Sequence, residues 1–185
     1  MKELANFCHR VLGPFLLVFA LSACSSGLSA GLEPFQTSNG RYGFFYPTGW
    51  TRVAVNGGPE VVFHDVINSD ETLSLVVSDV SNAPQLEKLG SSIDVGQRLI
   101  DEVIAPLGGD REAELVETKE RELNGHTFYD IEYSIHLPDR DRHELATVVL
   151  DGDSLLTLAA STNEKRWPKV KELFYRVITS LTVLS

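Results

Sequence analysis

Two histidines flank a short segment in which aspartate and arginine alternate. His136 and His143 enclose residues 137–142, which include Asp139 and Asp141. If the flanking residues form a hairpin, the two imidazoles face each other with a carboxylate nearby, a ligand set that suits zinc or manganese. The alternative is a solvated hairpin tip, whose aspartates and arginines pair with one another in water. The sequence leaves both interpretations open.

A second group of charged residues could bind a partner. At 100° per residue, Lys165, Lys169 and Arg176 lie within about 40° of one another around a helix. They are opposite an apolar face that contains Trp167 and Phe174. On a chain with a formal charge of −10, a basic stripe predicts a docking surface for an acidic partner. The solvated side of an ordinary amphipathic helix accounts for the pattern equally well.

No catalytic motif accompanies these groups in the sequence. There is no Gly-rich phosphate loop, no Gly-x-Ser-x-Gly elbow and no His-Glu-x-x-His segment. Cys8 and Cys24 are the only cysteines, which rules out a CxxC metal site. Nucleic-acid binding needs a cationic face, which the acidic composition argues against. The sequence therefore predicts a binding protein, not an enzyme, with no required cofactor.

The N-terminal residues indicate export followed by lipid attachment. A basic start precedes an apolar stretch from Val11 to Leu21, well short of the roughly 20 residues of a membrane-spanning helix. The stretch ends in Leu21-Ser22-Ala23-Cys24, which matches the lipobox of bacterial lipoproteins. We expect residues 1–23 to be a signal peptide and Cys24 to be the lipidated N-terminus. The alternative is an ordinary signal peptide with an incidental cysteine.

The rest of the chain is predicted to be a flexible tether, residues 24–34, and one domain, residues 35–185. A helix is expected to start at a capping box formed by Ser91 and Asp94 and to end near Leu107. A second helix is expected within residues 163–182. The predicted strands are Tyr42–Tyr46, Glu60–Val66, Leu73–Val80, Ala113–Leu123, His126–Leu137, Glu144–Asp151 and Ser154–Ser161. Strands and helices without strict alternation predict an α+β domain, with a central antiparallel sheet covered by helices.

Several short motifs follow one another in a characteristic order. They are Tyr42-Gly43-Phe44-Phe45-Tyr46-Pro47 with Trp50, Val61-Val62-Phe63-His64-Asp65, Leu89-Gly90-Ser91, Gly125-His126-Thr127-Phe128-Tyr129 with Glu132-Tyr133, and Glu164-Lys165-Arg166-Trp167 with Ser180. Together they resemble the PsbP family of photosystem II extrinsic proteins, in particular its lipoprotein form. The resemblance implies an α/β/α sandwich on the lumenal side of the thylakoid membrane. It also implies photosystem II core subunits as partners, and we expect a monomer.

The resemblance leaves more than one role open. Assembly or stabilisation of photosystem II is the expected role. Plant PsbP carries a longer N-terminal extension that is associated with calcium and chloride retention, whereas here only residues 25–34 precede the domain. Calcium is therefore implied by the resemblance alone. The alternatives are an oxygen-evolving-complex subunit that retains calcium and chloride, and a lumenal carrier of zinc or manganese.

Overall fold

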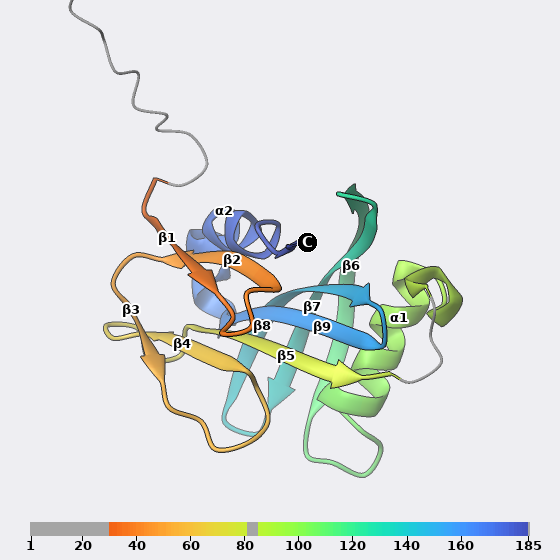
Figure 1. Ribbon diagram of the computed structural model, residues 1–185. Helices are drawn as coiled ribbons and strands as arrows, with labels where there is room; N and C mark the ends of the chain where they lie inside the picture. The colour runs from red at the N-terminus through yellow and green to blue at the C-terminus, as the bar shows by residue number, and fades with distance from the viewer. Residues whose placement is uncertain (1–29, 81–84, 185) are drawn as a thin grey trace, which may run out of the picture.

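The computed structural model describes residues 30–80 and 85–184 of the chain (Figure 1). The predicted signal peptide, the lipidation site Cys24 and the first part of the predicted tether lie outside the described residues. In the part of the chain that is described, no helix has the length and apolar character needed to cross a membrane.

A seven-stranded antiparallel sheet forms the centre of the domain. Its strands are β3 (Trp50–Val53), β4 (Val61–Asp65), β5 (Thr72–Asp79), β6 (Glu112–Leu123), β7 (His126–Leu137), β8 (Arg140–Asp151) and β9 (Ser154–Asn163). Their order is β3-β4-β5-β9-β8-β7-β6. Two meanders, β3 to β5 and β6 to β9, are therefore joined where β5 pairs with β9. The four predicted long strands are confirmed. Of the three predicted short strands, Glu60–Val66 and Leu73–Val80 correspond to β4 and β5, whereas Tyr42–Tyr46 belongs to the other sheet, and the unpredicted β3 takes the place beside β4.

Two-residue turns set the register of the long strands. Asn124 and Gly125 connect β6 to β7 with φ angles of 53° and 78°, the left-handed conformation that a tight hairpin turn requires at both positions. Pro138 and Asp139 connect β7 to β8. The predicted loop at residues 138–142 is therefore shorter than expected, because β8 begins at Arg140.

A smaller sheet packs beside the large one. Strands β1 (Leu32–Gln36), β2 (Tyr42–Pro47) and β10 (Thr182–Val183) form it in the order β1-β2-β10. Leu32 is buried and pairs with Pro47, so the fold begins three residues before the predicted boundary at Phe35. β1 and β10 are too short to show a hydrophobic period, and the sequence did not predict them.

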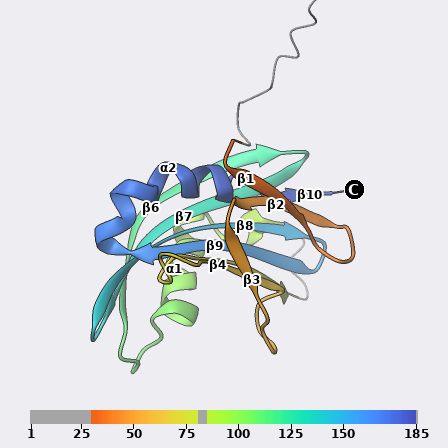
Figure 2. The same cartoon turned by 90° about the vertical axis from the view of Figure 1, so that its left-hand side faces the viewer.

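Helices lie on both faces of the large sheet (Figures 1 and 2). On one face, α2 (Trp167–Ile178) packs with the small sheet over a core that includes Phe63, Leu158 and Phe174. On the other face, α1 (Ser92–Leu99) covers β6 and β7. The short 3-10 turns η1 (Leu86–Leu89) and η3 (Glu164–Arg166) precede the two helices. This arrangement is the predicted α+β sandwich around an antiparallel sheet.

Helix α1 starts as predicted but ends differently. The Ser91 hydroxyl accepts a hydrogen bond from the Asp94 amide, and the Asp94 carboxylate accepts one from the Ser91 amide, which is a capping box. After Leu99 the chain widens into a π-helical turn, η2 (Ile100–Ile104), closed by the Ala105 amide on the Ile100 carbonyl. The wider turn changes the phase of the apolar face, and Val103 becomes exposed.

Gly96 brings α1 close to the sheet. A Cβ atom at this position would lie 3.1 Å from Leu115 and 3.3 Å from Ile131. Glycine lowers the helix propensity by about 1 kcal/mol relative to alanine. The close approach of the helix backbone to β6 and β7 explains why the helix contains it.

Candidate functional site

A buried carboxylate joins β7 to α2. Glu132 is only 3% exposed and accepts hydrogen bonds from two side chains of α2, the Trp167 indole at 3.1 Å and the Tyr175 hydroxyl at 2.8 Å. The Lys171 ammonium lies 3.4 Å from both carboxylate oxygens. His143 Nε2 is the fourth donor, at 2.9 Å. We call Glu132, His143, Trp167, Lys171 and Tyr175 the Glu132 cluster.

His143 lies between two carboxylates. Its Nε2 contacts Glu132, and its Nδ1 contacts Glu164 at 2.9 Å. The ring stacks on Trp167 with a centroid distance of 4.1 Å. The ring therefore connects the start of α2 to β7.

The protonation states in this cluster follow from burial and hydrogen bonding. Burial on its own would raise the pKa of Glu132, but hydrogen bonds from Tyr175 and His143 and the Lys171 charge outweigh it and lower that pKa. Burial, followed by the hydrogen bond to Glu132, raises the pKa of Tyr175. At neutral pH an ionised carboxylate thus accepts from a neutral phenol. These contacts fix α2 on the sheet, so the cluster positions the helix.

The structure places the four predicted metal ligands in three separate locations. Because the turn is Pro138-Asp139, His136 pairs across the strands with Asp141, and the two exposed side chains meet at 2.5 Å. His143 pairs with Ser134 and belongs to the Glu132 cluster. Asp139 lines a groove at the tip of the hairpin.

The predicted arrangement of two facing histidines is therefore wrong. The register of β7 and β8 puts His136 and His143 at different positions along the hairpin, where each is bound to a different carboxylate. Within residues 30–80 and 85–184, no three His, Cys, Asp or Glu side chains are grouped in a way that could hold a metal ion. The two histidines therefore do not share a site, and the exposed His136–Asp141 pair fits the alternative interpretation, a solvated hairpin tip.

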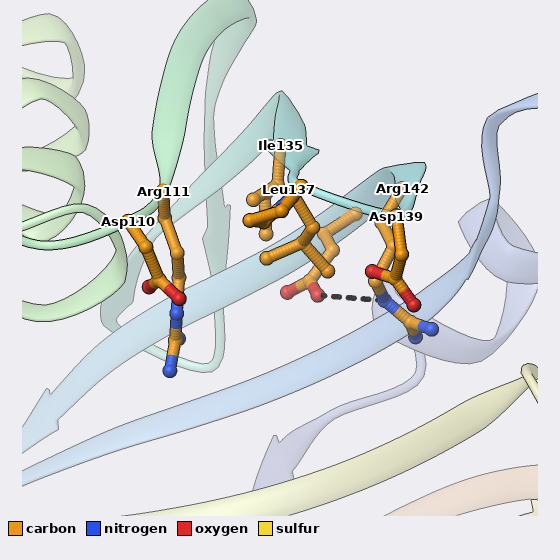
Figure 3. Close-up of a pocket in the computed structure, with 8 residues that line it drawn as sticks. Asp110, Arg111, Ile135, Leu137, Asp139 and Arg142 are labelled. Atoms are coloured by element: carbon orange, nitrogen blue, oxygen red, sulfur yellow. Dashed lines mark ion pairs between the residues drawn. The ribbon is translucent and has the colours of Figure 1, made fainter.

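The groove at the hairpin tip has an apolar floor and charged walls (Figure 3). Its volume is about 470 Å³, and it is lined by Asp110, Arg111, Ile135, Leu137, Pro138, Asp139, Arg142 and Glu144. Arg142 donates to Ser161 and to the Asp70 carbonyl, both at 3.0 Å, and lies 3.8 Å from Glu144. Glu144 accepts from Tyr133 at 2.8 Å. The charges of Arg142 and Glu144 are therefore already engaged within the fold.

The predicted basic stripe is divided into two parts. Lys165 lies in η3 and Lys169 in the first turn of α2, and both are exposed. Arg176 instead donates to the Ala30 carbonyl at 2.7 Å, because the N-terminal residues of the domain run past this end of the helix. The exposed Glu172 lies between Lys169 and Arg176 in the sequence. Lys165 and Lys169 remain as the exposed basic pair.

The fold and these sites define a single α+β domain, in which the buried Glu132 cluster fixes a helix on the sheet. The chain belongs to the PsbP family, whose profile matches residues 30–183. It is 39% identical to CyanoP of Synechocystis sp. over 94% of each chain. It is 36% identical to CyanoP of Thermosynechococcus vestitus, over 91% of this chain and 93% of that protein.

Comparison with solved structures gives the same result. The solution structure of cyanobacterial PsbP (CyanoP) from Synechocystis sp. matches with a TM-score of 0.72 and 38% identity, over 84% of this chain and 94% of that chain. Mycobacterium tuberculosis LpqN, which is involved in cell envelope biogenesis, matches with a TM-score of 0.57 and 12% identity, over 83% of this chain and 91% of that chain. The second likeness concerns the fold alone.

Proposed function

We propose that this protein is a lipid-anchored, non-catalytic binding module of photosystem II that assists assembly or stabilisation of the complex on the lumenal side of the thylakoid membrane. The observation that carries the proposal is its similarity to CyanoP over nearly the full length of both chains. The family is one of photosystem II-associated proteins of the thylakoid lumen. A binding role needs a stable scaffold with surface charge, which fits a domain whose buried polar groups hold α2 in place.

The proposed docking surface is the start of α2. Lys165 and Lys169 are exposed there, on a chain whose formal charge is −10. Opposite charges across an interface accelerate association more than they increase final affinity. An acidic lumenal surface of photosystem II core subunits is the complementary partner.

A charge reversal tests this surface. Lys165→Glu with Lys169→Glu should slow association with photosystem II membranes severalfold at low salt. The difference should disappear near 1 M salt, where the Debye length is about 3 Å. The matched control is Lys88→Glu with Arg98→Glu, the same change of charge at exposed positions on the α1 side. Equal association rates for the two double variants would place the docking surface elsewhere.

The lipid anchor is tested separately. Cys24 lies outside the described residues, and the lipobox that precedes it motivates the proposal. Two or three acyl chains at about 0.8 kcal/mol per buried CH₂ hold a protein firmly on a bilayer. Cys24→Ala should therefore move the protein from the membrane pellet to the supernatant in an alkaline carbonate wash. A variant that stays in the pellet as the wild type does would contradict the anchor.

A further inference from the structure

The chain joins the folded domain at a fixed point beside α2. Arg176 donates to the Ala30 carbonyl at 2.7 Å, and the Thr48 amide donates to the Gly31 carbonyl at 3.0 Å. From Leu32 onward the chain is paired in β1 with β2. We call the surface around Ala30, Thr48, Arg176 and Thr179 the anchor-side face. The chain is thus held against the domain from Ala30 onward, whereas the tether was predicted to extend to residue 34.

Little chain separates this point from the proposed lipid. Six residue steps lead from Cys24 to Ala30, and even fully extended they span at most about 21 Å. A domain of about 155 residues has a radius of gyration near 15 Å, which corresponds to a diameter of about 40 Å. The available chain is thus about half as long as the domain is wide.

We propose that the short chain keeps the anchor-side face turned toward the bilayer, so that the lipid surface itself is the neighbour of this face. The inference rests on the proposed lipid anchor at Cys24. If the domain turned over, Ala30 would lie about 40 Å from the membrane, which is beyond the reach of six residues. The orientation follows from chain length and needs no specific lipid contact.

The same geometry determines what faces the lumen. In Figures 1 and 2 the start of β1 lies at the top of the domain, whereas the loop before β6 and the β7–β8 hairpin lie at the bottom. The groove of Figure 3 is formed by these two segments. The groove is therefore held away from the bilayer, while α2 lies in the half of the domain near the lipid. A partner at Lys169 must accordingly be close to the membrane surface.

Site-directed spin labelling measures this orientation directly. The mature chain has no cysteine besides Cys24, whose sulfur is blocked by lipid, so one introduced cysteine is a unique labelling site. Thr179→Cys reports on the anchor-side face and Asp139→Cys on the groove. Each full-length lipidated variant is incorporated into phosphatidylcholine vesicles that contain a nickel-chelating lipid. We expect severalfold stronger paramagnetic relaxation at position 179 than at position 139.

If vesicle-bound protein shows equal relaxation at the two positions, or stronger relaxation at position 139, the proposed orientation is wrong. The proposed lipid anchor would not be affected by that result. Labelled protein that fails to pellet with the vesicles would refute the lipid anchor, and the inference with it. Insertion of twelve Gly and Ser residues between Cys24 and Ala30 adds about 42 Å of chain, so relaxation at the two positions should converge. If the inserted variant keeps the wild-type order, chain length does not hold the face, and the inference is wrong.

Discussion

Replacement of Glu132 by glutamine should destabilise the domain strongly, although the two side chains have nearly the same shape. In the wild type one carboxylate receives donors from His143, Trp167, Lys171 and Tyr175. A glutamine offers one acceptor oxygen, and its amide presents additional donors to groups that already donate. Some donors must lose their partner, and the Lys171 ammonium loses its counter-charge.

The size of the effect follows from the burial of the site. A buried donor left without an acceptor costs about 1–3 kcal/mol, and removal of one partner from a buried ion pair costs about 3–5 kcal/mol. Lys171 is partly exposed, so solvent weakens the contribution of its ion pair with Glu132 to the free energy of unfolding. We expect Glu132→Gln to lower the free energy of unfolding by about 3 kcal/mol. For a domain of this size the melting temperature should fall by about 6–12 °C.

Urea unfolding measures this difference in the Cys24→Ala background, which removes the proposed lipidation site. The matched control is Glu117→Gln. Glu117 lies 3.4 Å from the same Tyr175 hydroxyl, but its side chain is 46% exposed, and its loss should cost less than about 0.5 kcal/mol. If the two variants have free energies of unfolding within 0.5 kcal/mol of each other at pH 7, the carboxylate does not hold α2 as we infer.

The pH dependence gives an independent check. Since folding lowers the pKa of Glu132, its contribution is fully present above the ordinary glutamate range and is lost as the pH falls through the lowered value. The stability difference between wild type and Glu132→Gln should therefore be largest near pH 7. It should shrink in acid, where the wild-type carboxyl becomes protonated. A difference that stays constant from pH 7 down to pH 3 would contradict the charge-based argument.

Three further changes test local features. Gly96→Val should lower the free energy of unfolding by about 2 kcal/mol, because the added atoms meet Leu115; an unchanged urea midpoint would show that α1 can move away. Asn124→Ala should lower the free energy of unfolding by about 1 kcal/mol, because alanine is strained at the φ of 53° that this position adopts. Asn124→Gly should lower it less in the same assay. Saturating zinc should leave the melting temperature unchanged, and a rise that His136→Ala abolishes would establish a metal site.

The long strands and the start of α1 could be predicted because their signals are local. Asn124 and Gly125 mark a turn by themselves, and Ser91 with Asp94 forms a cap within four residues. Pairing between distant segments carries no such signal. β10 has two residues and becomes a strand only because β2 is already next to it. The π-helical turn after Leu99 contacts β6, a strand that comes later in the sequence.

The candidate site was harder to predict than the fold. His136 and His143 do not face each other, because a two-residue turn, instead of a longer loop, changed which side chains lie opposite one another. Part of the Glu132 cluster could have been predicted from the sequence. Three donors, Trp167, Lys171 and Tyr175, recur at intervals of four, which places them along one side of α2. Their acceptor, Glu132, lies on β7, and only the assembled sheet brings it beneath the helix.

The small sheet has a consequence for the order in which the chain can fold. Thr182 pairs with Gly43, and the Leu184 amide donates to the Arg41 carbonyl, so the last residues close a loop that spans almost the whole domain. Until α2 is available, the core that contains Phe44, Phe63 and Phe174 is incomplete. A nascent chain therefore gains little from folding early, because contacts this distant form slowly. For a protein exported as we propose, we expect the chain to remain largely unfolded until its C-terminus has been made.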